Sequence, residues 1–183
     1  ARARRAVEPV DASLFQRFLL EWQGVNGLPG PAPPHPQALA EVLEPLQGVP
    51  LPVTLWEGAV LPARLPGSGP GSLDTLGGGG EWLWRVERWR PPEPPWVAYY
   101  LRALYPLLAR PAGEVPEGGR AVLELLQRGG ARFTGEVAAA LGIPPRTAHE
   151  VLVRLAGAGY VANDSVSALG PPPPWEGGDG DGV

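Results

Sequence analysis

Arginine and aromatic side chains alternate over a short stretch near the middle of the chain. Arg85, Arg88 and Arg90 surround Trp89, so a planar ring lies beside three permanent cations. An aromatic ring can stack on a nucleobase while guanidinium groups bind phosphate, and a single-strand-binding surface needs this combination. The alternative is that Trp89 packs against another domain of a longer polypeptide. The sequence leaves both interpretations open.

A second set of polar side chains recurs at helical spacing over residues 145–156. Its members share the outward face of the predicted helix: Arg146, Thr147, His149, Glu150, Val153 and Arg154. As the last helix of a helix-turn-helix, it can enter a DNA major groove. Residues 120–169 contain five arginines and four acidic residues, a net of +1, so charge does not exclude a module that only packs against other domains.

We expect no catalytic residue and no metal site in this chain. Its two histidines, His35 and His149, occur without any cysteine and are a poor ligand set for zinc. The serines have no accompanying histidine and acid pattern, which disfavours a nucleophilic triad. Glu41 and Glu44 lie one helical turn apart, as on a solvated helix face. Because the chain has no lysine, it cannot form a Gly-Lys phosphate-binding loop, and we expect no cofactor.

The helix that carries Arg146 belongs to a pattern typical of a winged helix over residues 120–169. Apolar spacing and glycine stops predict helices over 121–128, 135–141 and 145–156, with Thr134 capping the second. Residues 131–133 are expected to form a strand bridge, and 160–162 with 165–169 a hairpin. The core is expected to combine Leu125, Leu126, Val137, Leu141, Val151, Leu152 and Leu155.

The arginine-rich stretch around Trp89 lies in a predicted hairpin over 81–101, with strands 81–90 and 96–101. Alternation places Trp82, Trp84 and Val86 on one face and Arg85 with Trp89 on the other. Helices are predicted up to residue 23 after a cap at Asp11 or Ser13, with Trp22 in the core, and over 36–47, 54–64 and 72–76, the last capped by Ser72.

The fold class predicted is therefore mainly α with small β hairpins (α+β), as tandem winged-helix-like modules. We expect a module over 1–110, a linker over 111–119, a winged helix-turn-helix module over 120–169 and a disordered Pro/Gly/acidic tail over 170–183. Arg2, Arg4 and Arg5 form either a basic arm or a frayed terminus.

The composition places broad bounds on the class of protein. The chain has 183 residues, 44% hydrophobic, with a net charge of −4. The lack of cysteine and of any long apolar run predicts a cytoplasmic protein without disulfides or a membrane span. Methionine is absent, including at position 1, so we expect a piece of a longer polypeptide.

Several short signatures follow one another along residues 1–169. They are Phe18-Leu19 with Trp22-Gln23; Leu46-Gln47-Gly48; Trp56-Glu57 before Leu61-Pro62-Ala63-Arg64; Leu73-Asp74; Gly80-Glu81 with Trp84; Gly130-Ala131 with Phe133; and Gly159 before Asn163-Asp164-Ser165. In this order and spacing, the chain resembles the DEAD/H-associated region of large helicase-related (Lhr) ATP-dependent helicases. It departs from that family at Thr134, where members often have an aromatic residue, and in its four-glycine run and polyproline tail.

The resemblance implies an accessory segment of winged-helix and β-barrel type that follows two motor domains and grips the tracked strand. The parent protein would be an ATP-dependent 3′-to-5′ helicase, a hydrolase linked to DNA repair, and ATP and Mg would be bound by its motor domains. The implied partners are single-stranded DNA or DNA–RNA hybrid, and the motor domains of the same polypeptide. A non-catalytic protein-interaction scaffold and a glycosylase-like DNA repair domain are the alternatives.

Overall fold

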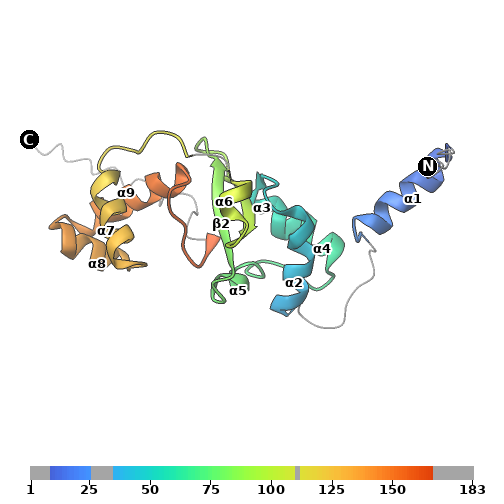
Figure 1. Ribbon diagram of the computed structural model, residues 1–183, viewed down its shortest axis with the longest axis horizontal. Coiled ribbons are helices and arrows are strands. Elements are labelled where there is room, and N and C mark those ends of the chain that lie inside the picture. Colours follow the sequence, from blue (N-terminus) through green and yellow to red (C-terminus); the bar gives the residue numbers. More distant parts are fainter. Residues whose placement is uncertain (1–8, 26–34, 110–111, 167–183) are drawn as a thin grey trace, which may run out of the picture.

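The computed structural model describes residues 9–25, 35–109 and 112–166. In Figure 1, a small antiparallel sheet lies between two groups of helices, one built from α2 to α4 and the other from α7 to α9. We call residues 35–109 the first module and residues 112–166 the second module. The predicted basic arm at Arg2, Arg4 and Arg5 and the predicted tail over 170–183 lie outside the described residues.

The first module has the element order of a winged helix, with short helices before a hairpin. Its elements are α2 (Pro36–Leu43), the 3-10 helix η1 (Glu44–Leu46), β1 (Leu51–Pro52), α3 (Val53–Leu55), the π-helix η2 (Trp56–Val60), α4 (Leu61–Arg64), α5 (Asp74–Gly77), β2 (Trp82–Arg88), β3 (Trp96–Leu101) and α6 (Tyr105–Leu108). The antiparallel strands follow the order β1-β3-β2, so β2 is an edge strand.

The core of the first module lies between the sheet and helices α2 to α5. Trp82, Trp84 and Val86 are buried in it, as alternation along the strand predicts. Trp56 is fully buried, and its indole N–H donates to the carbonyl of Val97 at 2.9 Å, which joins the helical layer to β3. Burying this polar group costs little because it is hydrogen-bonded.

Element boundaries in the first module differ from the predictions where the backbone departs from regular geometry. The helix predicted over 36–47 becomes 3-10 at Glu44, and the one over 54–64 contains the π-helix η2. Pro62 has no amide hydrogen, so the regular bonding ladder is interrupted just after η2. Ser72 does not cap α5; its hydroxyl accepts from the amide of Gly69.

The second module is a three-helix unit whose apolar stripes meet in one core, as predicted. Its helices are α7 (Gly119–Gly129), α8 (Thr134–Leu141) and α9 (Pro145–Gly157). The predicted core residues all belong to this cluster: Val137, Val151 and Leu155 are buried, and Leu125, Leu126, Leu141 and Leu152 are partly buried against them. Val122 and Ala148 are buried with them, and the structure confirms the α+β fold class.

Two predicted strand segments of the second module are wrong. Residues 131–133 make no strand bridge, and residues 160–162 are not a strand. The predicted return strand over 165–169 lies partly outside the described residues; Ser165 and Val166 pack on the first module instead. The predicted cap at Thr134 is also wrong, because Phe133 is the N-cap residue of α8 and Thr134 is already helical. The carboxylate of Glu136 accepts from the amide of Phe133 at 2.8 Å.

Helix α1 (Ala12–Trp22) lies apart from the two modules at one end of the molecule (Figure 1). Asp11 caps it by accepting from the amide of Leu14 at 2.9 Å, and hydrogen bonds from Ser13 and Leu14 hold the pKa of Asp11 below its usual value. None of its residues is buried, and Trp22 is 73% exposed, so the prediction of Trp22 as a core residue is wrong. No helix in the described ranges is long and apolar enough to cross a membrane.

Candidate nucleic-acid interface

Helix α9 presents a polar outer face that the second module leaves open. Pro145 starts the helix, where its missing amide hydrogen is not needed. The inner face is buried, whereas Arg146, Thr147, His149 and Arg154 are exposed, as the spacing predicts. The fold thereby brings these four predicted site residues onto one accessible helix surface.

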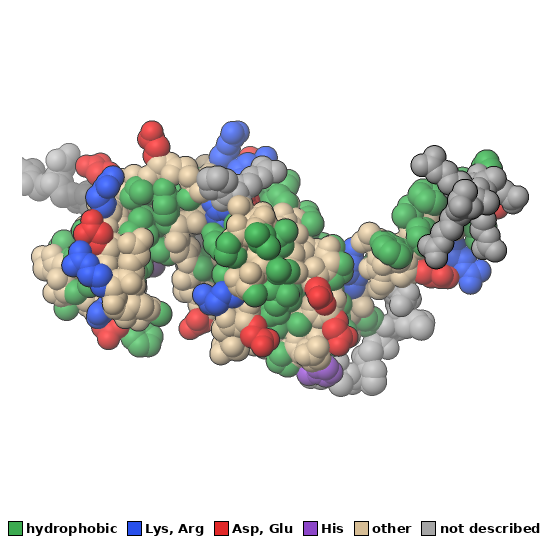
Figure 2. All heavy atoms as spheres, viewed as in Figure 1, with side chains coloured by type: hydrophobic (Ala, Val, Ile, Leu, Met, Phe, Trp, Pro, Cys, Tyr) green, Lys and Arg blue, Asp and Glu red, His purple; other side chains and the backbone are tan. Residues whose placement is uncertain are grey.

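The charge on this face is partly balanced by its own glutamate. The Nε atom of Arg146 lies 3.1 Å from the carboxylate of Glu150, and both side chains are largely exposed, at 73% and 49%. Such surface pairs contribute little to stability, so a phosphate can compete for the guanidinium. Arg154 forms no ion pair within the described residues. On the face shown in Figure 2, blue and red side chains are interspersed rather than gathered into one basic patch.

The β2–β3 hairpin carries the second predicted group, and its two end arginines are exposed. Arg88 and Arg90 are both open to solvent. The guanidinium carbon of Arg88 lies 3.8 Å from the ring centroid of Trp96, a cation–π contact that orients the group without removing its N–H donors. The hairpin therefore offers two cations, one of them already stacked on an aromatic ring.

Trp89 does not lie where strand alternation predicts. A β-bulge between Val86 and Arg88 adds one residue to β2, so Trp89 falls on the side of Trp84 and Val86 and packs against the same core. Its ring lies so close to Gly157 that a Cβ there would be 2.9 Å from it. Its indole N–H donates to the carbonyl of Glu93 at 3.1 Å. This half-buried position is a contact within the chain itself, which neither base stacking nor packing against another domain had predicted.

Arg85 is also placed differently from the exposed, DNA-facing position that we predicted. Only 6% of its surface is exposed. Its Nε donates to the carbonyl of Gly159 at 3.1 Å, and its Nη1 lies 3.5 Å from the carboxylate of Glu87. Tyr100 donates its hydroxyl to the same carboxylate at 2.8 Å, and burial, together with this hydrogen bond, raises the pKa of Tyr100. Arg85 therefore joins the two modules from the inside.

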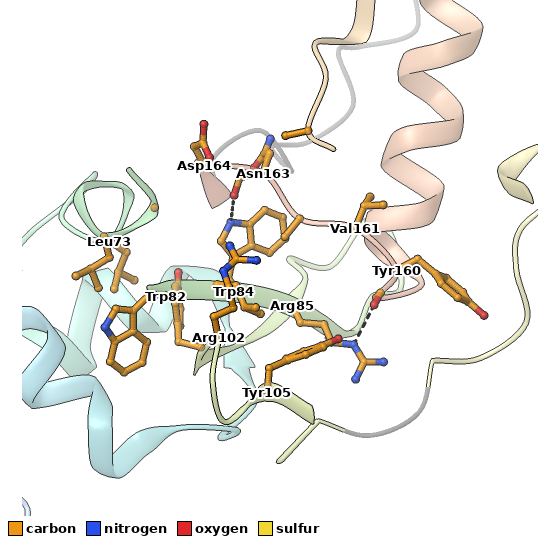
Figure 3. A pocket seen from close by; sticks show the side chains of 17 residues that line it. Leu73, Trp82, Trp84, Arg85, Arg102, Tyr105, Tyr160, Val161, Asn163 and Asp164 are labelled. Atoms are coloured by element: carbon orange, nitrogen blue, oxygen red, sulfur yellow. Dashed lines mark hydrogen bonds between the residues drawn. The ribbon is translucent and has the colours of Figure 1, made fainter. Parts of the chain in front are cut away.

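The junction between the modules contains a cavity of about 330 Å³. Figure 3 shows Trp84 and Arg85 pointing from β2 toward the segment after α9. The indole N–H of Trp84 donates to the carbonyl of Asn163 at 2.8 Å across this junction. Tyr105 and Tyr160 also line the cavity, together with aliphatic, polar and charged residues.

Phe133 is an exposed residue that the sequence analysis did not select for a site. It is 83% exposed at the start of α8, beside the exposed Arg132. Its backbone amide donates to the carboxylate of Glu136 at the helix start. An arginine followed by an aromatic residue after Gly129 and Gly130 was the available signal, since the glycines end α7 and leave the next residues in an exposed loop.

Comparisons with known proteins find one family match in each half of the chain. Residues 10–102 match the winged-helix domain of large helicase-related protein, and residues 119–165 match the IclR helix-turn-helix domain. A protein of Mycolicibacterium smegmatis, Lhr helicase/probable uracil glycosylase, is 32% identical over 178 residues, which cover 92% of this chain and 11% of that protein. Lhr helicase/uracil glycosylase of Escherichia coli is 32% identical over 151 residues, covering 74% of this chain and 10% of that protein.

The winged-helix match covers residues 10–102, and the two relatives match 92% and 74% of the chain. The chain spans only 11% and 10% of the length of these two relatives. Helix-turn-helix and winged-helix units are DNA-binding folds, in agreement with the exposed face of α9. The chain belongs to the large helicase-related (Lhr) family, in which it is an accessory winged-helix segment of an Lhr-type helicase.

Proposed function

We propose that this segment grips the tracked DNA strand while it packs on the motor domains of its parent helicase. It would lie in the DEAD/H-associated region of a cytoplasmic enzyme, whose motor domains would bind ATP and Mg and act on single-stranded DNA or DNA–RNA hybrids. The observation that carries the proposal is the open face of α9, where Arg146, Thr147, His149 and Arg154 are exposed together. Cations on such a face can bind phosphates irrespective of base sequence.

The packing part of the proposal rests on helix α1. Its apolar side chains remain exposed, among them Phe15 at 50%, Phe18 at 50% and Trp22 at 73%. Phe18 also contacts Phe15 and Trp22, with ring centroids 6.4 and 5.7 Å away, so the three rings form one continuous surface. A patch of this kind is characteristic of a surface that another protein domain covers. Because relatives extend far beyond this segment, a domain of the same polypeptide is the proposed partner.

Measuring DNA binding against salt concentration tests the proposed contact with phosphate. Arg146→Ala and Arg154→Ala should weaken binding to all sequences alike, and each should reduce the salt slope by about 0.9 for each phosphate that the arginine neutralises. Fluorescence anisotropy with labelled single strands, duplexes and DNA–RNA hybrids provides the measurement. Unchanged affinity in both variants, with the fold intact, would favour a protein-interaction scaffold.

Arg128→Ala is the matched control for Arg146→Ala. Arg128 lies on α7 and pairs with Glu124 at 3.1 Å, the same distance and the same four-residue separation as the pair of Arg146 with Glu150. Both substitutions remove one exposed arginine from an exposed pair and change the net charge equally. A loss of affinity in both variants would indicate a nonspecific effect of charge, whereas a loss with Arg146→Ala alone supports contact through α9.

A base-excision role is the second candidate function. The names of both relatives include a uracil glycosylase activity, and the cavity of about 330 Å³ at the module junction is lined in part by aromatic residues. Incubating the chain with uracil-containing DNA and assaying for abasic sites tests this role. Formation of abasic sites by the chain would favour it, and intact DNA after prolonged incubation would argue against it.

A further inference from the structure

In the first module the helix just before the hairpin is a single turn, Asp74–Gly77, and the second module covers it. The helix that precedes the hairpin of a winged helix occupies the recognition position, and here it is α5. Asp74 of α5 accepts from the hydroxyl of Ser165 at 2.8 Å and from the amide of Val166 at 3.2 Å. A Cβ on Gly77 would overlap the carbonyl of Asp164. The end of the second module therefore occupies the place where DNA would approach α5.

The second module has the opposite arrangement. Its α9 is 13 residues long with an open outer face, yet residues 160–166 form no strand. They cross to the first module, where Asn163 accepts from the indole of Trp84 (Figure 3). Val166 is buried against the core of the first module. Within the described residues, the second module thus has a recognition helix without a hairpin, and the first has a hairpin without an accessible recognition helix.

The hairpin of the first module is attached to the C-terminal end of α9. The ring of Trp89 lies against Gly157, the last residue of the helix. Two residues later, Gly159 accepts from the buried guanidinium of Arg85, and a Cβ at Gly159 would lie 2.5 Å from that group. These two contacts hold the hairpin against the end of α9 and against the residues that follow it. Arg88 and Arg90 flank the contact and stay exposed.

We propose that the two modules form one composite winged helix that binds duplex DNA. In it, α9 enters the major groove and the β2–β3 hairpin, borrowed from the first module, contacts the flanking phosphates. The inference rests on the proposed DNA contact. It specifies that the segment binds the tracked strand where that strand is base-paired. A B-form major groove admits an α-helix, whereas the deep, narrow major groove of A-form helices does not.

A steric wedge between the hairpin and α9 tests the composite surface. Gly157→Leu adds a side chain where even a Cβ would be 2.9 Å from Trp89, so it should push the hairpin away from the helix. Gly58→Leu is the control, because Gly58 has no atom within 4 Å of its Cβ position and lies in the first module. Circular dichroism and urea unfolding establish that each variant is folded. Trp89→Ala, which removes the ring instead of displacing it, replaces the wedge if Gly157→Leu does not fold.

The measurement is the affinity for a one-turn DNA duplex as a function of salt, with and without Arg90→Ala. In the unmodified chain, Arg90→Ala should weaken binding several-fold and flatten the salt slope by about 0.9. In the Gly157→Leu background the same substitution should have no effect, while Arg154→Ala keeps its full effect. In the Gly58→Leu background, Arg90→Ala should act as in the unmodified chain.

The outcomes separate the inference from the function on which it rests. If the unmodified chain shows no salt-dependent binding to any DNA, the proposed function and the composite surface both fail. If it binds duplex but Arg90→Ala acts equally with and without the wedge, or has no effect at all, only the composite surface fails. Tighter binding to a single strand or a DNA–RNA hybrid than to the duplex would overturn the choice of duplex DNA.

Discussion

Replacing Arg85 by methionine tests whether the modules are held together by buried charge. Methionine retains much of the side-chain volume but removes the donor to Gly159 and the cation beside Glu87. The side chain of Glu87 is 12% exposed and would keep the hydroxyl of Tyr100 as its partner among the described residues. Breaking one side of a buried ion pair costs about 3–5 kcal/mol because the remaining charge is left uncompensated. We expect a loss of stability of that size.

Urea unfolding followed by tryptophan fluorescence and by far-UV circular dichroism measures this loss. With a slope of about 2 kcal/mol per molar urea, the midpoint should fall by roughly 1.5–2.5 M. Adding Glu87→Gln to Arg85→Met removes the unpaired charge and should restore about 1–3 kcal/mol, which a double-mutant cycle measures as coupling.

Arg102→Met is the matched control for Arg85→Met. The Nε of Arg102 also donates to a backbone carbonyl, that of Gly80 at 2.7 Å, but the residue is exposed. Its replacement should cost less than about 1 kcal/mol, since water can take the place of the guanidinium as donor. A cost below about 1 kcal/mol for Arg85→Met, or a double variant no more stable than the single one, would refute the reasoning.

Three further predictions concern the core of the second module, ATP hydrolysis and the buried phenols. Leu155→Ala should cost about 4 kcal/mol in urea unfolding and Leu152→Ala about 2, because Leu155 is fully buried and Leu152 partly so; equal costs would contradict this packing. The purified chain should release no phosphate from ATP, and turnover above that of a buffer blank would contradict the assignment of ATP to the motor domains. Burial raises the pKa of both Tyr99 and Tyr100. Their contribution to stability is complete below the unfolded pKa of about 10 and decreases as the pH rises further, because the unfolded chain loses these protons first. Tyr100→Phe should reduce that alkaline loss in pH-dependent unfolding, and an unchanged pH profile would argue against it.

The elements that local pattern predicts well are those whose signals lie within a few residues of each other. The stripe of Ala148, Val151 and Leu155 on α9 follows from helical periodicity, and Gly142, in the left-handed conformation at φ 64°, ends α8 where glycine is expected. The burial of Trp82 and Trp84 follows from strand alternation. In these cases the local spacing and the final packing have the same periodicity, so no distant contact is needed to interpret them.

Alternation could not place Trp89, because a bulge just before it reverses the side on which later residues point. The extra residue between Val86 and Arg88 moves the ring from the predicted outer face to the core side, against Gly157. A bulge depends on how two strands pair, and the residues of β2 alone carry no clear signal for it. The same limit applies to Trp22, whose apolar helix face predicts burial although no described residue covers it.

Local spacing along the chain was enough to predict the α+β class, the three helices of the second module and the outward arginines of α9, because periodicity, glycine stops and proline starts act locally. The accessibility of the hairpin arginines depends instead on long-range packing. Arg85 is buried because Gly159 packs across β2 and accepts its hydrogen bond. Gly159 is 74 residues further along the chain. Long-range contacts also place residues 163–166 on the first module, since their hydrogen bonds go to Trp84 and Asp74. Such long-range pairings are a property of the packed chain, and no local spacing encodes them.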